Sequence, residues 1–92
     1  MHALSASEIA VRLHSIPAWQ VDAGELVRIF AFPDFSAALG FVNKVGALAE
    51  EAGHHPDIDI RYNRVRLSLV THDANGLTAQ DFDLAAAVDA LA

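Results

Sequence analysis

The chain has 92 residues, of which 53% are hydrophobic, and its formal net charge at pH 7 is −6. This length fits one domain, residues 1–92, with a real hydrophobic core, although such a short chain buries only about 60–65% of its unfolded surface. The chain has only six Lys and Arg residues, which argues against direct nucleic-acid binding, because such binding needs many basic contacts. The lack of cysteine excludes disulfides, thiol nucleophiles and thiolate metal sites.

The first predicted element is a helix over residues 6–16. Ser5 and Glu8 have the spacing of a capping box, so the helix begins just after Ser5, and Pro17 ends it. Charged residues such as Arg12 interrupt its apolar pattern, so this segment predicts neither a signal peptide nor a membrane span. The expected location is therefore cytoplasmic.

Two strands are predicted next, over residues 19–22 and 25–32, joined by a turn at residues 23–24. In the first strand Trp19 and Val21 alternate with polar residues, which indicates one covered face. The second strand carries apolar residues on both faces, so both need cover. Because helices usually cover one sheet face in a small domain, the other face is a candidate subunit interface.

A long helix is predicted over residues 35–52. Asp34 caps its start, and Gly53 ends it in the left-handed conformation that is common after helices. The pair His54-His55 then lies beyond the helix C-terminus, whose partial negative charge favours a protonated imidazole. The apolar residues that recur at helical spacing are Phe35, Ala38, Leu39, Val42, Val45, Leu48, Ala49 and Ala52.

The strands expected over residues 58–62 and 65–71 alternate apolar and polar side chains and form a hairpin through a two-residue turn at residues 63–64. After a polar loop, Thr78 and Asp81 repeat the capping-box spacing and open a final helix. Hairpins between helices indicate an α+β fold of order αββαββα. It would have a four-stranded antiparallel sheet with helices packed on one face.

Three of the five histidines lie close to this second hairpin. His54 and His55 precede it and His72 follows it, so antiparallel pairing would bring all three to one rim. Imidazole, with an ordinary pKa of about 6.5, suits acid–base chemistry near neutral pH. Two alternatives stay open: the histidines belong to a corner and a loop without function, or they bind zinc, although adjacent histidines rarely converge on one ion.

A series of motifs runs through the second half of the chain: Glu50, His54-His55-Pro56, Tyr62-Asn63, Thr71-His72, Gly76-Leu77 and Asp81. Together with Trp19 and the segment FAFPDFSAALGFVNKVGALAE, this series resembles the pterin-4a-carbinolamine dehydratase family, also known as the dimerisation cofactor of a homeodomain transcription factor. The resemblance covers roughly residues 4–91.

The resemblance implies a lyase that dehydrates 4a-hydroxytetrahydropterin, the product of aromatic amino-acid hydroxylases, to quinonoid dihydropterin and water. The hydroxylases' pterin would thereby be recycled, as the substrate of an enzyme with no cofactor of its own and no metal. The elimination needs an acid near the departing oxygen and a base near the N5 proton. By the same resemblance, we expect a homodimer or homotetramer and a hydroxylase as a possible partner.

The resemblance also assigns the site. It implies that His54, His55 and His72 are catalytic, with His54 and His72 as acid–base groups and His55 orienting the substrate. The residues expected to bind substrate are Glu50, Trp19, Pro56 and Asp81. Structural alternatives remain for three of these four: a solvated helix-end charge for Glu50, a core side chain for Trp19, and the capping box for Asp81.

Two other functions remain possible from the sequence. The same fold in this family also serves as a protein-binding module that stabilises a transcription factor dimer. A relative acting on another pterin, such as a molybdopterin-related metabolite, is the third hypothesis. The presence of His54, His55 and His72 favours the enzyme, because a scaffold would not need all three.

Overall fold

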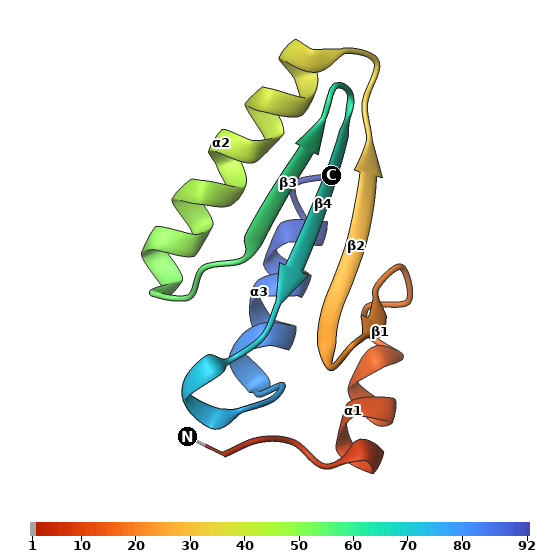
Figure 1. Cartoon of the computed structure of the whole chain (residues 1–92), viewed down its shortest axis with the longest axis vertical. Coiled ribbons are helices and arrows are strands. Elements are labelled where there is room, and N and C mark those ends of the chain that lie inside the picture. Colours follow the sequence, from red (N-terminus) through yellow and green to blue (C-terminus); the bar gives the residue numbers. More distant parts are fainter. Residues whose placement is uncertain (1) are drawn as a thin grey trace.

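The three helices and the four strands of one sheet follow one another along the chain in the order that the sequence predicted (Figure 1). The computed structural model describes residues 2–92, and the α+β class is confirmed. None of the helices within that range is both long and apolar enough to cross a bilayer. The elements are α1 (Ala6–Leu13), β1 (Gln20–Asp22), β2 (Glu25–Ala31), α2 (Phe35–Ala52), β3 (Asp57–Arg61), β4 (Arg64–Leu69), the 3₁₀ turn η1 (His72–Ala74) and α3 (Ala79–Asp89).

Side-chain caps start the helices where the sequence predicted. The capping boxes of α1 and α3 are both formed, and Asp34 accepts a hydrogen bond from the backbone of α2. The predicted end of α1 at residue 16 is wrong, because the helix ends at Leu13. Beyond it the chain tightens, with the Ile16 amide donating to the Leu13 carbonyl at 3.1 Å, and Ile16 turns into the core at 1% exposure.

The sheet is antiparallel throughout, in the order β1-β2-β4-β3, so β2 and β4 form its centre. Leu26 and Phe30 of β2 oppose Leu69 and Val65 of β4, and all four are buried against the helices. On the other sheet face, Ile29 of β2 is 56% exposed. The helices therefore cover one face, and the role of the open face as a subunit interface stays a prediction.

The turn of the second hairpin differs from the prediction by one residue. It lies at Tyr62 and Asn63 rather than at residues 63–64, and Arg61 pairs with Arg64. Tyr62 takes a left-handed φ of 52°, which is uncommon for an aromatic residue. Asn63 ties this turn to a segment outside the hairpin, because its side-chain amide donates to the Phe32 carbonyl at 2.8 Å.

The apolar stripe predicted for α2 is only partly buried. Phe35 and Leu39 remain 45% and 41% exposed, so not every residue of the predicted apolar pattern packs into the core of this chain. The sheet lies against a narrower row of side chains, because a helix presents only positions three or four apart to one neighbouring surface. The buried residues of α2 are Ala38, Phe41, Val45 and Ala49.

Candidate functional site

The three histidines near the second hairpin line one cavity of about 430 Å³. The predicted gathering of His54, His55 and His72 is thus confirmed. The cavity lies where the C-terminal end of α2, the chain after β4 and the first turn of α3 meet. Its full lining consists of Gly53, His54, His55, Val70, Thr71, His72, Asp73 and Gln80.

Local backbone geometry fixes the two chain segments that carry the histidines. Gly53 ends α2 with a left-handed φ of 63°, and the amide of His54 donates to the Ala49 carbonyl at 3.1 Å, as in a helix C-cap. On the other side, Thr71 and Gly76 form an isolated β-bridge that closes the loop containing His72. The helix cap and the bridge therefore bring residues from distant parts of the sequence to one cavity.

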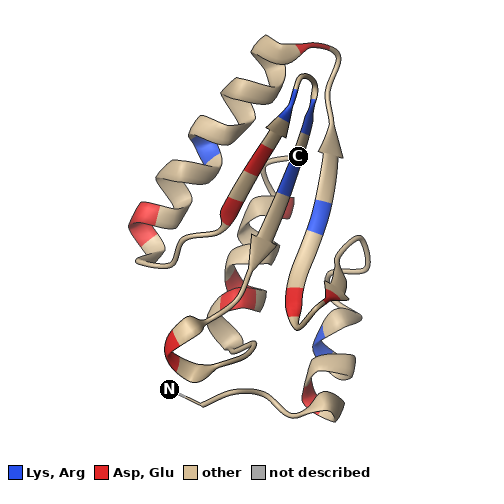
Figure 2. Cartoon of the chain, in the orientation of Figure 1, with Lys and Arg blue, Asp and Glu red and all other residues tan. Residues whose placement is uncertain are grey.

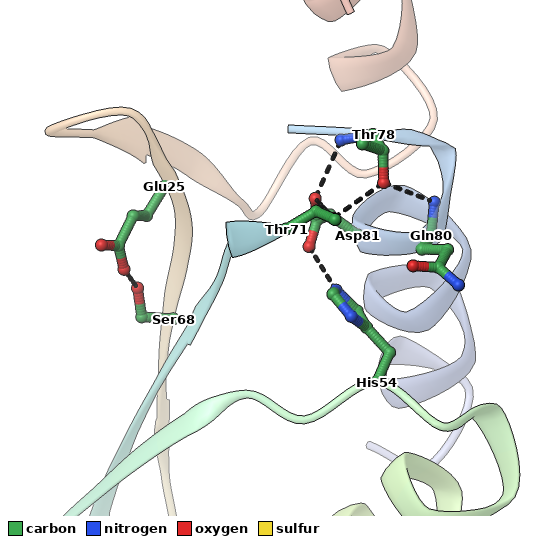
Figure 3. A network of polar contacts seen from close by, with 7 residues as sticks. All are labelled: Glu25, His54, Ser68, Thr71, Thr78, Gln80 and Asp81. Carbon is green, nitrogen blue, oxygen red and sulfur yellow. Dashed lines mark hydrogen bonds and ion pairs between the residues drawn. The ribbon is translucent and has the colours of Figure 1, made fainter. Parts of the chain in front are cut away.

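His54 is anchored by a buried carboxylate (Figure 3). Its Nε2 atom lies 2.5 Å from Oδ1 of Asp81, and the side chains of His54 and Asp81 are 11% and 0% exposed. The second oxygen of Asp81 accepts hydrogen bonds from the Thr71 hydroxyl at 2.8 Å and the Thr78 amide at 2.9 Å. A buried carboxylate is costly unless it is hydrogen bonded, and here both oxygens have partners.

His55 has a different environment from its neighbour. Its Nε2 atom lies 2.5 Å from Oε2 of Glu50, but the two side chains are 61% and 79% exposed. Such an exposed pair contributes little to stability. Glu50 is therefore a solvated charge near the end of α2 that also contacts a cavity-lining histidine.

His72 lies in η1, lines the same cavity and is exposed. Among residues 2–92 its imidazole makes no side-chain hydrogen bond or ion pair, so both ring nitrogens are accessible. His54, His55 and His72 thus combine one anchored imidazole, one exposed imidazole paired with a carboxylate, and one unpaired imidazole.

Trp19 and Pro56 do not line this cavity. Trp19 is 3% exposed in the core, packs edge-on against Phe30, and donates from Nε1 to Asp89 at 2.8 Å. Pro56 is half-buried in the segment between His55 and β3. Trp19 is therefore a core side chain in this structure, as the structural alternative for it proposed.

The sequence did not single out Gln80 or the hydroxyl of Thr71 as site residues. Gln80 borders the histidine cavity and also a neighbouring cavity of about 310 Å³ between α2 and α3, which shares His54 with the first. The only advance signal was the capping box, which places Gln80 in the first turn of α3. The sequence pointed to Thr71 only as the residue before His72 in the Thr71-His72 motif.

The charges around the site are mostly negative. Acidic residues lie at the end of α2 and in η1, whereas most of the arginines of β3 and β4 lie toward the turn of the hairpin (Figure 2). No Lys or Arg lines the histidine cavity. Within residues 2–92, no group of three or more His, Cys, Asp and Glu side chains is placed to hold a metal ion.

Comparison with known proteins finds relatives in both sequence and structure. A sequence model described as pterin 4 alpha carbinolamine dehydratase matches residues 2–91. A protein of Acidobacterium capsulatum named "Putative pterin-4-alpha-carbinolamine dehydratase" is 63% identical over 91 residues, which cover 99% of both chains.

Two solved structures are similar in fold. One is a crystal structure of a transcriptional coactivator/pterin dehydratase from Brucella melitensis, with a TM-score of 0.94, 36% identity and 99% coverage of both chains. The other is a pterin dehydratase-like protein identified as a RuBisCO assembly factor in the alpha-carboxysome, with a TM-score of 0.66 and 31% identity over 79% of this chain and 84% of that one. The chain therefore belongs to the pterin 4 alpha carbinolamine dehydratase family.

Proposed function

We propose that the protein dehydrates a 4a-hydroxytetrahydropterin to a quinonoid dihydropterin and water, and so recycles the pterin of aromatic amino-acid hydroxylases. The observation that carries this proposal is the cavity lined by His54, His55 and His72, with one imidazole backed by the buried carboxylate of Asp81. The name of the Acidobacterium relative supports the same reaction class.

The reaction needs proton transfer at two atoms of the substrate. The bond between C4a and the hydroxyl oxygen breaks, and that oxygen leaves as water after it gains a proton. N5 loses its proton, and a double bond forms between C4a and N5. No atom is lost except in water and no electrons are exchanged with another molecule, so one acid and one base are sufficient.

The histidines fit this requirement. His54 and His72 lie on different segments around the cavity and serve as the two proton-transfer groups, while His55, with Glu50, orients the substrate. The Asp81 carboxylate stabilises the imidazolium form of His54 at whichever step that charge is present. Two general acid–base groups typically contribute about 10²–10⁴-fold each.

A stopped-flow dehydration assay tests the proposal. The wild-type protein should accelerate loss of water from the carbinolamine over the spontaneous reaction, and His54→Ala should lower kcat/KM about 10²–10⁴-fold. His14→Ala is the matched control, because His14 is an exposed residue at the end of α1, outside the cavity. A wild-type protein that gives only the spontaneous rate would defeat the proposal.

A second candidate function is protein binding. The two structural relatives are described as a coactivator/pterin dehydratase and as a RuBisCO assembly factor, and Phe35 and Leu39 of α2 are exposed apolar side chains. We propose that this part of α2 contacts a protein, either another copy in a homodimer or homotetramer or a hydroxylase. Light scattering of Phe35→Ser/Leu39→Ser should then show a smaller particle, and an unchanged mass would argue against self-association there.

A further inference from the structure

We infer that the hydroxyl of Thr71 is a positioning group for His54. Through Asp81 it keeps the His54 proton on Nε2, so that Nδ1 is the ring nitrogen left for proton exchange in the cavity. The catalytic meaning of this inference rests on the proposed function, whereas the order of the hydrogen bonds does not.

The directions of these bonds follow from counting protons around Asp81. An ionised carboxylate carries no proton, so each of its partners must donate. Oδ2 has the Thr71 hydroxyl at 2.8 Å and the Thr78 amide at 2.9 Å, and Oδ1 has Nε2 of His54 at 2.5 Å. Nε2 therefore carries a proton, and in the neutral imidazole Nδ1 is the acceptor.

The directions of the hydrogen bonds made by the two threonine hydroxyls follow from the same proton count. The oxygens of Thr71 and Thr78 lie 2.8 Å apart, and the single proton of Thr71 already goes to Asp81. The Thr78 hydroxyl must then donate to Thr71, while its own oxygen accepts from the Gln80 amide at 3.3 Å. A fixed backbone N–H thus begins a chain of donors that ends at the carboxylate facing His54 (Figure 3).

Because these residues are buried, water cannot easily replace a hydrogen bond that is lost among them. Thr71, Thr78 and Asp81 are 5%, 2% and 0% exposed, and every buried side-chain polar atom in the described part of the chain has a partner. Without the Thr71 hydroxyl, Oδ2 keeps only the Thr78 amide, and the carboxylate has one hydrogen bond fewer to hold it against His54. The hydrogen bond that one ring nitrogen of a histidine makes determines which of the two nitrogens carries the proton.

The test compares Thr71→Val, which has nearly the same shape without the hydroxyl, with Thr71→Ser, which keeps it. The β-bridge of Thr71 with Gly76 uses backbone atoms, so both variants retain it. Ser68→Ala is the matched control, because it removes a hydroxyl of equal burial, at 5% exposure, that donates to Glu25 rather than to Asp81 (Figure 3).

The first readout is the His54 tautomer, measured by ¹⁵N NMR of labelled histidine. Wild type, Thr71→Ser and Ser68→Ala should carry the proton on Nε2, and Thr71→Val should show a mixture of tautomers. A wild-type proton on Nδ1 would overturn the inference even if Thr71→Val failed to fold. This readout needs no activity, so Nε2–H in a protein without dehydratase activity would support the hydrogen-bond order while the proposed function failed.

The second readout is the division of the effect between kcat and KM. Thr71→Val should lower kcat about 10- to 100-fold, because a misplacement of about 1 Å at a reacting group can cost about 100-fold, with KM nearly unchanged. Thr71→Ser should restore most of kcat, and Ser68→Ala should keep it. Equal kcat in Thr71→Val and wild type, or an equal loss in Thr71→Ser and Thr71→Val, would contradict a role for the hydroxyl.

Discussion

The imidazole of His54 and the carboxylate of Asp81 are joined at 2.5 Å between Nε2 and Oδ1, although the residues are 27 positions apart. Asp81 also belongs to the capping box at the start of α3, where its other oxygen accepts from the Thr78 amide. One buried carboxylate therefore starts a helix and faces a cavity-lining histidine. The capping-box interpretation of Asp81 is confirmed, whereas its role in substrate binding stays a prediction.

Asp81→Asn should damage both stability and activity. An amide has one acceptor oxygen, so it cannot accept from the Thr71 and Thr78 donors and also from His54. Its NH₂ group would face Nε2 and force the His54 proton to Nδ1. We expect a loss of about 1–3 kcal/mol in the free energy of unfolding by urea denaturation, and a fall in kcat of about 10²–10⁴-fold by stopped flow. Wild-type kcat in a folded variant would contradict this account of His54.

His72→Ala should separate activity from stability. The side chain is exposed and makes no side-chain hydrogen bond within residues 2–92, so the free energy of unfolding should change by no more than about 0.5 kcal/mol. Loss of a proton-transfer group should nevertheless lower kcat/KM about 10²–10⁴-fold. Thermal unfolding and stopped flow on the same preparation measure both quantities. An unchanged rate would remove His72 from the mechanism.

Trp19→Phe should lower stability and leave substrate binding intact. The phenyl ring can keep the core contact with Phe30 but cannot donate to Asp89, which also accepts from Arg28 at 2.6 Å. The loss of one hydrogen bond corresponds to about 0.5–1.5 kcal/mol. KM should stay at the wild-type value. A KM raised several-fold without loss of stability would instead support the substrate-binding role that the resemblance implied.

The capping box of α1 should make part of the stability depend on pH. The hydrogen bond from the Ser5 amide lowers the pKa of Glu8 below its ordinary value of 4.5. Because the folded-state pKa is the lower one, this contribution is complete above 4.5 and is lost as the pH falls through the folded-state pKa. The stability difference between wild type and Glu8→Ala should shrink below pH 4.5, measured by urea denaturation. A difference that stays constant with pH would contradict it.

Local signals predicted most of the fold. Capping residues placed the helix starts, and alternation placed the strands, because both depend on residues close together in the sequence. The hairpin turn was misplaced because Tyr62 adopts a positive φ that its residue type does not favour, while Asn63 bonds to Phe32 in the segment after β2. Such a contact between distant residues leaves no local pattern.

The candidate site was predictable only in outline. A hairpin with histidines before and after it indicated their convergence, and the cavity confirms that convergence. The local spacing of Thr78 and Asp81 revealed the cap but not the contact from Asp81 to His54, since His54 comes from another part of the chain. Trp19 matched a family motif, yet its position in the core depends on packing that the motif alone does not describe.

A crystal structure with a bound 7,8-dihydropterin, which lacks the 4a-hydroxyl and cannot react, tests the central claim most directly. We predict that the bicyclic ring occupies the cavity between His54 and His72, with ring nitrogens of both histidines about 2.6–3.2 Å from pterin atoms or joined to them through one water. A pterin bound elsewhere on the protein, with both imidazoles beyond that reach, would contradict the account.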